Sequence, residues 1–155
     1  MYSNDLICDI LEYIDKFIYT KISIEDLELN FFYSRYYIMK LFKKEIGITI
    51  IDYINKVRIN NSINEINNTS SLLIKVAINN GFYSLEYFSE MFKKEIGISP
   101  KQYKMLIKNK YRYNDKLELA MSNIIKIKNI ISYTNKYKEN RKRKTMPIKK
   151  ISIFD

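Results

Sequence analysis

The chain of 155 residues contains no histidine and a single cysteine, Cys8. Histidine, cysteine and clustered carboxylates are the usual metal ligands and catalytic groups, and no helical face of this sequence gathers such side chains. The chain also has only three glycines, and none of them belongs to a glycine-rich loop that could cradle a phosphate. These absences argue against an enzyme and predict that the protein binds no metal ion or other cofactor.

Signals for export and for membrane spanning are also missing. No run of residues approaches the roughly 18 apolar residues that a spanning helix needs, and the N-terminus has no basic segment followed by an apolar core. A single cysteine cannot form a disulfide within the chain, and Cys8 falls on the side of the first predicted helix that we expect to be buried. We therefore expect a cytoplasmic protein without a membrane partner.

Positive charge is abundant but unevenly placed. The formal net charge is +10, yet residues 1–110 carry a net charge of only +2, whereas the short segment 136–150 carries +7. Clustered lysines and arginines attract phosphates without reading a base sequence. We expect residues 136–155 to form a disordered basic tail. One alternative function is therefore a non-specific nucleic-acid-binding protein driven by this tail.

The string Phe-Lys-Lys-Glu-Ile-Gly-Ile occurs twice, at residues 42–48 and 92–98. The similarity extends beyond the string, since Tyr53 reappears as Tyr103 at the same interval of 50 residues. One structural unit is thus used twice, and two copies are too few for a solenoid. This favours a function that needs two equivalent contacts at a fixed separation.

Within the repeated string, most residues are best interpreted as scaffold. Phe42 and Phe92 are expected to be core anchors, and Gly47 and Gly97 stand where a left-handed residue closes a helix most cheaply. The lysines of the string are the only candidates for DNA contacts. We therefore expect the functional side chains just upstream of each copy.

Helical periodicity covers the first 110 residues, with almost no strand alternation. Capping residues such as Ser23, Ser34 and Ser99 mark helix starts. The pattern predicts helices over about 5–17, 23–30, 34–46, 49–66, 72–79, 84–96 and from 99 onward. A further amphipathic helix is predicted within 111–135, with the apolar stripe Leu117, Ala120, Ile124, Ile127 and Ile131. We expect this helix to dock on the preceding domain or on a second copy of the chain.

Two helix pairs, each a short helix, a tight turn and a second helix with a polar N-terminal face, have the helix-turn-helix pattern. The predicted domain 1–110 comprises a first unit at about 5–48, a linker helix at about 49–66 and a second unit at about 70–108. A linker of about 18 residues would be roughly 27 Å long. This length suits two reading helices, at about 34–46 and 84–96, in successive major-groove segments about 34 Å apart.

The second unit carries a long series of spaced residues: Val76, Ala77, Gly81, Phe82, Tyr87, Phe88, Phe92, Lys93, Gly97, Ser99, Pro100 and Tyr103. The first unit supplies Leu27, Ser34, Phe42, Lys43, Lys44, Gly47 and Tyr53, and the linker supplies Arg58 and Ile59. Through these residues the sequence, over about 5–108, resembles the DNA-binding domain of the AraC/XylS family of bacterial transcription regulators.

The resemblance implies an all-α fold with two homeodomain-like helix-turn-helix units of three helices, joined by the linker helix, to which this chain adds a C-terminal helix. It implies a regulator that binds double-stranded DNA sequence-specifically, as a monomer or a weak dimer. Contact with RNA polymerase is a family-level expectation. The chain resembles the stand-alone members, because we expect no small-molecule effector domain in it.

In the first reading helix, the resemblance places base contacts at Tyr36, Met39 and Lys40. Lys40 could donate to guanine O6 or N7, while Tyr36 and Met39 could contact a thymine methyl group. Helical spacing puts these side chains on the face opposite the apolar stripe. The expected phosphate contacts of the two units are Ser34, Arg35, Lys43, Lys44, Ser84, Lys93, Lys94 and Lys104.

The second reading helix presents a different set, Leu85, Glu86, Ser89 and Glu90. Carboxylates near phosphates are repulsive unless they accept a hydrogen bond from a cytosine amine. We therefore expect the first unit to dominate affinity, with the second contributing weakly or selecting a cytosine-containing step. The acidic face also supports a further alternative, a protein-interaction module or remnant that keeps the fold without reading DNA.

The first unit departs from the family pattern at two positions. A small residue usually follows the position of Leu27 and a glycine usually stands in the turn, whereas this chain has Glu28 and Phe32. A buried carboxylate without a partner is costly. We therefore expect Glu28 to be partly exposed or paired.

Overall fold

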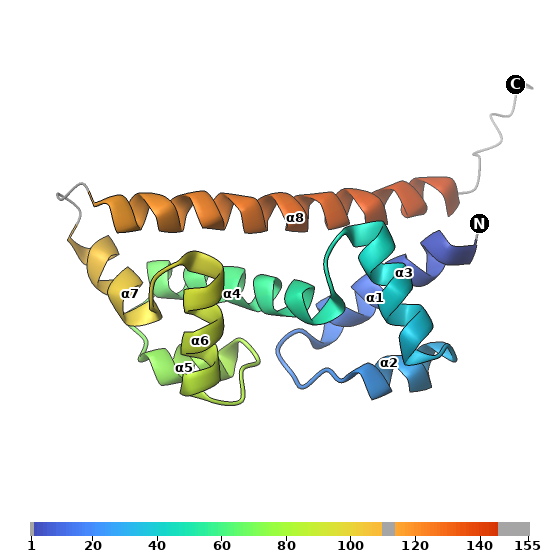
Figure 1. Cartoon of the computed structure of the whole chain (residues 1–155), viewed down its shortest axis with the longest axis horizontal. Helices are drawn as coiled ribbons and strands as arrows, with labels where there is room; N and C mark the ends of the chain where they lie inside the picture. The colour runs from blue at the N-terminus through green and yellow to red at the C-terminus, as the bar shows by residue number, and fades with distance from the viewer. Residues whose placement is uncertain (1, 110–113, 146–155) are drawn as a thin grey trace, which may run out of the picture.

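The computed structural model describes residues 2–109 and 114–145, which form eight α-helices and no strand (Figure 1). The helices are α1 (Tyr2–Phe17), α2 (Ile24–Phe31), α3 (Arg35–Ile46), α4 (Ile50–Asn68), α5 (Leu73–Asn79), α6 (Leu85–Ile96), α7 (Pro100–Lys108) and α8 (Asp115–Thr145). The predicted all-α fold with two helix-turn-helix units and an additional C-terminal helix is confirmed. No helix among the described residues is long and apolar enough to cross a membrane.

The first unit consists of α1, α2, α3 and the start of α4, which enclose one apolar core. Ile7 and Leu11 of α1 meet Leu27 of α2 and Phe42 of α3 in this cluster. Cys8 is buried on α1, as predicted, and makes no disulfide. Burial of such side chains is the main stabilising contribution to a fold of this size.

The second unit repeats this arrangement with α5, α6, α7 and the end of α4. Phe92 of α6 occupies the place that Phe42 has in the first unit, and both side chains are 0% exposed. Gly47 and Gly97 follow α3 and α6 with φ angles of 91° and 95°. The prediction that the repeated string supplies core anchors and helix caps is confirmed.

Helix starts lie where capping residues predicted them. Ser23 and Asp26 form a capping box at α2, and Ser34 caps α3. The linker α4 begins after Thr49 as expected but ends two residues later than predicted, at Asn68. Its last turn is closed by the backbone N–H of Thr69, which donates to the carbonyl of Glu65.

The helix α8 corrects one sequence-based expectation. Residues 136–145, predicted to belong to a disordered tail, continue α8 to Thr145. Two of their cations pair with α1, Arg141 with Asp9 and Lys138 with Asp15. The lysines and arginines of this segment are typical of a disordered tail. The carboxylates that pair with them and stabilise the helix lie more than 120 residues away in the sequence, so no local pattern predicts it. Residues 146–155 of the predicted tail lie outside the described residues.

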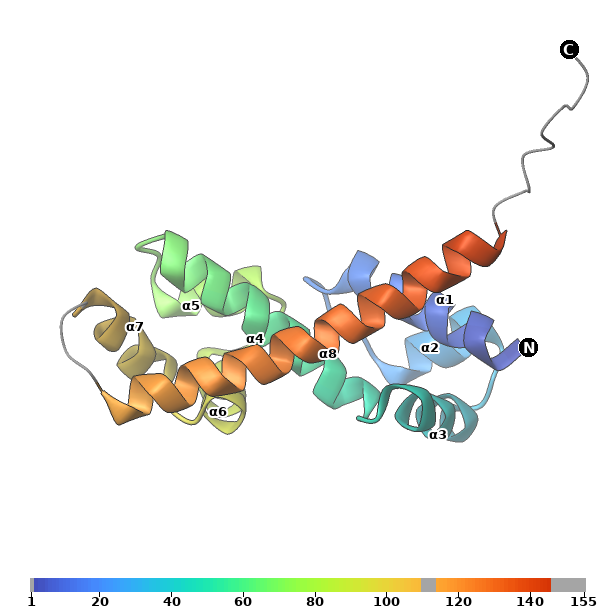
Figure 2. The ribbon, with the colours of Figure 1, turned by 90° about the horizontal axis from the view of Figure 1, so that it is seen from above.

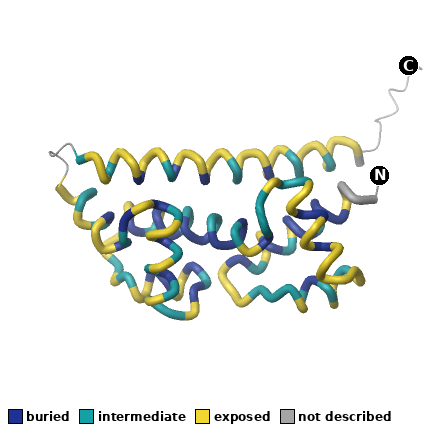
Figure 3. Tube along the Cα trace, viewed as in Figure 1, coloured by how far each residue is buried: buried dark blue, intermediate teal, exposed yellow. Residues whose placement is uncertain are grey.

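The apolar stripe predicted for α8 packs on the domain that precedes it. Ala120, Ile124 and Ile127 are buried in the core of the second unit. Figure 3 shows this division, with buried positions on the side of α8 that faces the domain and exposed positions on the other side. Seen from above, α8 crosses α4 at an angle and extends over both units (Figure 2). The helix thus docks within the chain, one of the two expectations for it.

Candidate DNA-binding surface

In Figure 1 the helix α6 stands upright and α3 runs obliquely downward from α8, and both lie toward the same edge of the molecule in Figure 2. Each begins at a serine whose hydroxyl accepts a hydrogen bond from a backbone N–H three residues on. Ser34 accepts from Tyr37 at 3.3 Å and Ser84 from Tyr87 at 3.1 Å. These hydroxyls therefore cap the helices, and a phosphate contact would have to share them.

The outer face of α3 carries the three predicted base-reading residues. Tyr36 is 71% exposed and Met39 is 40% exposed, and Lys40 is exposed beside them. The Lys40 ammonium lies 5.6 Å from the centre of the Tyr36 ring, a cation–π distance. The structure thus brings the Lys40 ammonium, a hydrogen-bond donor, together with the apolar groups of Tyr36 and Met39 on one exposed face of α3.

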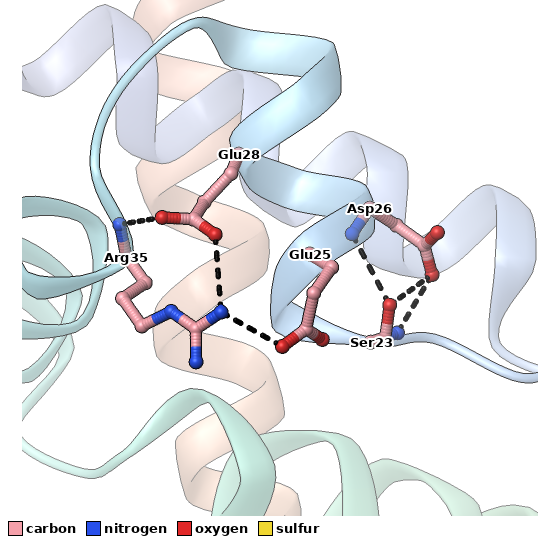
Figure 4. A network of polar contacts seen from close by, with 5 residues as sticks. All are labelled: Ser23, Glu25, Asp26, Glu28 and Arg35. Carbon is pink, nitrogen blue, oxygen red and sulfur yellow. Dashed lines mark hydrogen bonds and ion pairs between the residues drawn. The ribbon is translucent and has the colours of Figure 1, made fainter.

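Arg35 lies at the start of α3 but is held by two carboxylates of α2 (Figure 4). Its Nη2 lies 2.9 Å from Glu25 Oε1 and 3.4 Å from Glu28 Oε2, and its backbone N–H donates to Glu28 Oε1 at 2.5 Å. Glu28 is therefore paired and partly exposed, as expected. Because both pairs are at the surface, they contribute little to stability, but they offset the positive charge that a phosphate contact of Arg35 would need.

The outer face of α6 presents a different chemistry. Glu86 and Glu90 are exposed, whereas Leu85 packs against the core of the second unit and Ser89 is half-buried. Of the four residues of α6 that are predicted to read bases, the two carboxylates, Glu86 and Glu90, are therefore the most accessible to a partner. The first two turns of α6 hold no basic side chain, and the first cation, Lys93, follows Glu90 by three residues.

The lysines at the ends of α3 and α6 fall into two groups. Lys43, Lys44 and Lys93 are exposed and make no ion pair within the described residues. Lys94 pairs with Asp52 at 3.3 Å, and Lys104 donates to the carbonyl of Ser71. The first group keeps the free cation that a phosphate contact needs.

Sequence reasoning missed the aromatic pairs at the N-terminal end of each reading helix. Tyr33 stacks on Tyr37 with ring centres 5.2 Å apart, and Tyr83 stacks on Tyr87 at 4.9 Å. Tyr33 and Tyr83 are exposed at the N-terminal ends of α3 and α6. The repeat itself contained the signal, because both pairs recur at the interval of 50 residues.

Phe32 is the second feature that the sequence left unexplained. Its φ angle of 59° is left-handed, and its side chain is 90% exposed. Gly81, with a φ angle of 85°, makes the corresponding turn of the second unit, where an added Cβ would lie 2.6 Å from the carbonyl oxygen of Ile18. The first unit has open space at its turn and accepts a phenylalanine there, whereas the second unit admits only glycine.

Arg58 of α4 joins the two units. Its Nε donates to the carbonyl of Ile18 and its Nη2 to that of Thr20, while the guanidinium lies 6.0 Å from the Phe82 ring centre. Burial lowers the pKa of this guanidinium. A pocket of about 670 Å³ opens beside it between the units, with Tyr19 and Tyr83 among its walls. The units therefore meet here through Arg58 of α4 and through the close approach of Gly81 to the carbonyl of Ile18.

Two helix-turn-helix units with exposed reading helices are the arrangement of a DNA-binding domain. A family model described as a helix-turn-helix domain matches residues 30–105. The chain belongs to the AraC-type helix-turn-helix family. Among the described residues, no group of three side chains could hold a metal ion.

Three solved structures illustrate this relationship. A protein of unknown function from Listeria innocua is 31% identical over 63% of this chain and 93% of its own, with a TM-score of 0.60. The C-terminal domain of the response regulator AraT from Geobacillus stearothermophilus is 26% identical, covering 65% and 84%, with a TM-score of 0.62. The C-terminal domain of the response regulator yesN from Fusobacterium nucleatum is 28% identical, covering 67% and 99%, with a TM-score of 0.58. No protein of curated function matches the sequence.

Proposed function

We propose that the protein regulates transcription by binding double-stranded DNA sequence-specifically, with α3 and α6 in successive major-groove segments. The observation that carries this proposal is the exposed face of α3, where Lys40 lies beside Tyr36 and Met39. A lysine donor suits guanine and the apolar groups suit thymine methyl groups. Because one chain holds two reading helices, a monomer can reach two half-sites, and a weak dimer on DNA is not required.

The first unit supplies most of the affinity in this proposal. Exposed Lys43 and Lys44 extend the basic face of α3 toward the phosphates, whereas Glu86 and Glu90 on α6 repel them. A carboxylate contributes only where it accepts from a cytosine amine. The second unit therefore adds little affinity or selects a cytosine-containing step. Contact with RNA polymerase is a family-level part of the proposal.

Selection of binding sites from random duplex DNA is the first test. A bipartite motif with about one helical turn between its halves is expected. On the selected site, Lys40→Ala should weaken binding by about tenfold or more, because a good base contact is worth about 1–3 kcal/mol. Glu90→Ala should leave binding intact or strengthen it. Lys93→Ala is the matched control, which should weaken specific and random duplexes alike.

A protein-interaction role without DNA reading is the second candidate, because two carboxylates face outward from α6. The absence of any enriched motif in the selection would favour this candidate. Intact binding after Lys40→Ala together with loss after Glu90→Ala would reverse the order of the two units. Binding driven by the basic tail is less favoured, since Lys138 and Arg141 already pair with α1. Deletion of residues 136–155 should lower affinity for all duplexes equally and leave the preference for the selected site, whereas loss of all binding would favour the tail.

A further inference from the structure

The helix α8 lies beyond the region that the family model matches, which ends at residue 105. It is nevertheless the longest helix described, with 31 residues, and it packs on both units. Ile124 and Ile127 belong to the core cluster of the second unit, while Ile130 and Tyr137 pack against that of the first. One continuous helix therefore connects the two cores.

The side chains of α8 also reach the C-terminal end of each reading helix. The Asn123 amide donates to the carbonyl of Ile96 at 2.9 Å, and the Tyr133 hydroxyl donates to the carbonyl of Glu45 at 3.3 Å. The last four carbonyls of a helix lack partners within it, so these bonds satisfy groups that α3 and α6 leave open. Ten residues separate Asn123 from Tyr133, a rise of about 15 Å along α8.

A buried polar contact fixes the register of α8 against the linker. The Tyr53 hydroxyl at the start of α4 lies 3.0 Å from the hydroxyl of Thr134, which is fully buried. A one-residue slip of α8 would take this partner from the buried Tyr53 hydroxyl, which is costly inside a core, whereas Thr134 would keep its bond to the carbonyl of Ile131. Beyond it, Arg141 and Lys138 pair with Asp9 and Asp15 of α1.

Two helices, α4 and α8, therefore connect the units and cross each other, in addition to side-chain contacts such as those of Asn55 with Tyr87 and Lys94 with Asp52. A single helix such as α4 can bend gently and allows the units to twist about its axis. With α8 crossing α4 (Figure 2), that twist would break the contacts of Asn123 or of Tyr133. Both α4 and α8 therefore constrain the distance and the angle between α3 and α6.

We propose that α8 is a spacing device: it fixes the separation of α3 and α6, so that the protein discriminates among operators by the number of base pairs between their half-sites. This inference rests on the proposed function. One additional base pair moves a half-site by about 3.4 Å and turns it by about 34°. A braced pair of reading helices cannot follow that change, whereas a pair joined by one flexible helix can.

To test this proposal, glycines are introduced into α8 to make it flexible between the segment that docks on the second unit and the segment that docks on the first. Lys128 and Asn129 are both exposed there, and the variant Lys128→Gly/Asn129→Gly introduces a hinge without removing a buried group. The matched control, Ser122→Gly/Lys126→Gly, places the same number of glycines at exposed positions within the segment that docks on the second unit. Removing all of α8 is less informative, because it would uncover the core around Phe92.

The first measurement needs no DNA. Spin labels on Lys44→Cys of α3 and Glu86→Cys of α6, with Cys8→Ala, report the distribution of distances between the reading helices. The unaltered and control proteins should give one narrow distribution, and the hinge variant a broader one. Equal widths for the hinge variant and the control would overturn the proposal.

The second measurement compares duplexes whose half-sites are separated by the selected spacing or by one base pair more or less. The unaltered and control proteins should discriminate by at least about tenfold, and the hinge variant by less than about threefold. Unchanged discrimination in a hinge variant with a broadened distance distribution would refute the role of α8 in spacing. If no protein binds any duplex specifically, the proposed function fails, while the distance measurement still decides whether α8 braces the units.

Discussion

The two reading helices have the same ending and opposite faces. α3 and α6 both finish with Phe-Lys-Lys-Glu-Ile and a left-handed glycine, and both begin at a serine cap. Before that ending, α3 exposes Tyr36 and Lys40, and α6 exposes Glu86 and Glu90. The comparison teaches that the repeated string determines how a helix ends and packs, whereas the preceding turns determine what it presents to a partner.

The largest expected effect is on stability, and it tests whether Phe42 and Phe92 are equivalent core anchors in the two units. Phe42→Ala and Phe92→Ala should each lower the free energy of unfolding by about 3–5 kcal/mol, because each removes a fully buried ring. Urea unfolding followed by circular dichroism measures both. Leu29→Ala, at a largely exposed position of α2, is a control that should change little. A loss below about 1 kcal/mol for only one phenylalanine would show that the repeat does not supply equivalent anchors.

The turns give the next largest contrast. Gly81→Ala should destabilise by more than about 2 kcal/mol, because its Cβ would meet the Ile18 carbonyl at 2.6 Å in addition to the cost of the left-handed backbone. Phe32→Gly should instead stabilise by up to about 1 kcal/mol, since it relieves a left-handed phenylalanine whose side chain buries almost nothing. Thermal unfolding of the two variants measures the contrast. If Phe32→Gly were as harmful as Gly81→Ala, the exposed ring would have a packing role that its surroundings do not suggest.

The sequence predicted the local features of the fold but not its contacts between distant segments. The repeat, the caps and the periodicity predicted the helices and their buried faces, because those signals are local. The pairing of Arg35 with Glu25 and Glu28 depends on how α2 and α3 approach across the turn. The extension of α8 to Thr145 depends on carboxylates of α1 that lie at the other end of the chain. Such contacts determine which cations remain available to bind phosphates, and no local sequence pattern predicts them.

The difference between the two outer faces can be tested by reversing a charge. Glu90→Lys on α6 should raise affinity for duplex DNA several-fold at low salt and steepen the salt dependence of binding by about one unit. The reason is that a cation replaces a carboxylate beside the phosphates. Fluorescence anisotropy at several salt concentrations measures both quantities.

The matched control is Glu12→Lys, which makes the same change of charge at an exposed position of α1. It should affect binding less than Glu90→Lys does. Equal effects of the two substitutions would mean that α6 does not approach the DNA and that overall charge alone governs affinity.

The smallest expected effect concerns pH. In the first unit the capping residues of α2 and α4, Ser23 and Thr49, each donate a hydrogen bond to a carboxylate three residues on. Hydrogen bonds from Ser23 lower the pKa of Asp26, and the hydrogen bond from Thr49 lowers the pKa of Asp52. The second unit caps α7 with the uncharged Gln102. A lowered pKa in the folded state means that the caps stabilise fully above the unfolded value, about 3.9, and that this contribution is lost as the pH falls through the folded value.

Acidification should therefore loosen the start of α2 and of α4 while the start of α7 stays intact. Backbone amide chemical shifts followed between pH 6 and pH 2 measure this. The amides of Ser23 and Asp52 should titrate with midpoints below about 3.9, and that of Ser99 should not. Asp26→Asn should abolish the transition at Ser23 alone. A common midpoint at all three amides would instead mean that the units unfold together in acid, because the two cores that α8 connects would then respond as one.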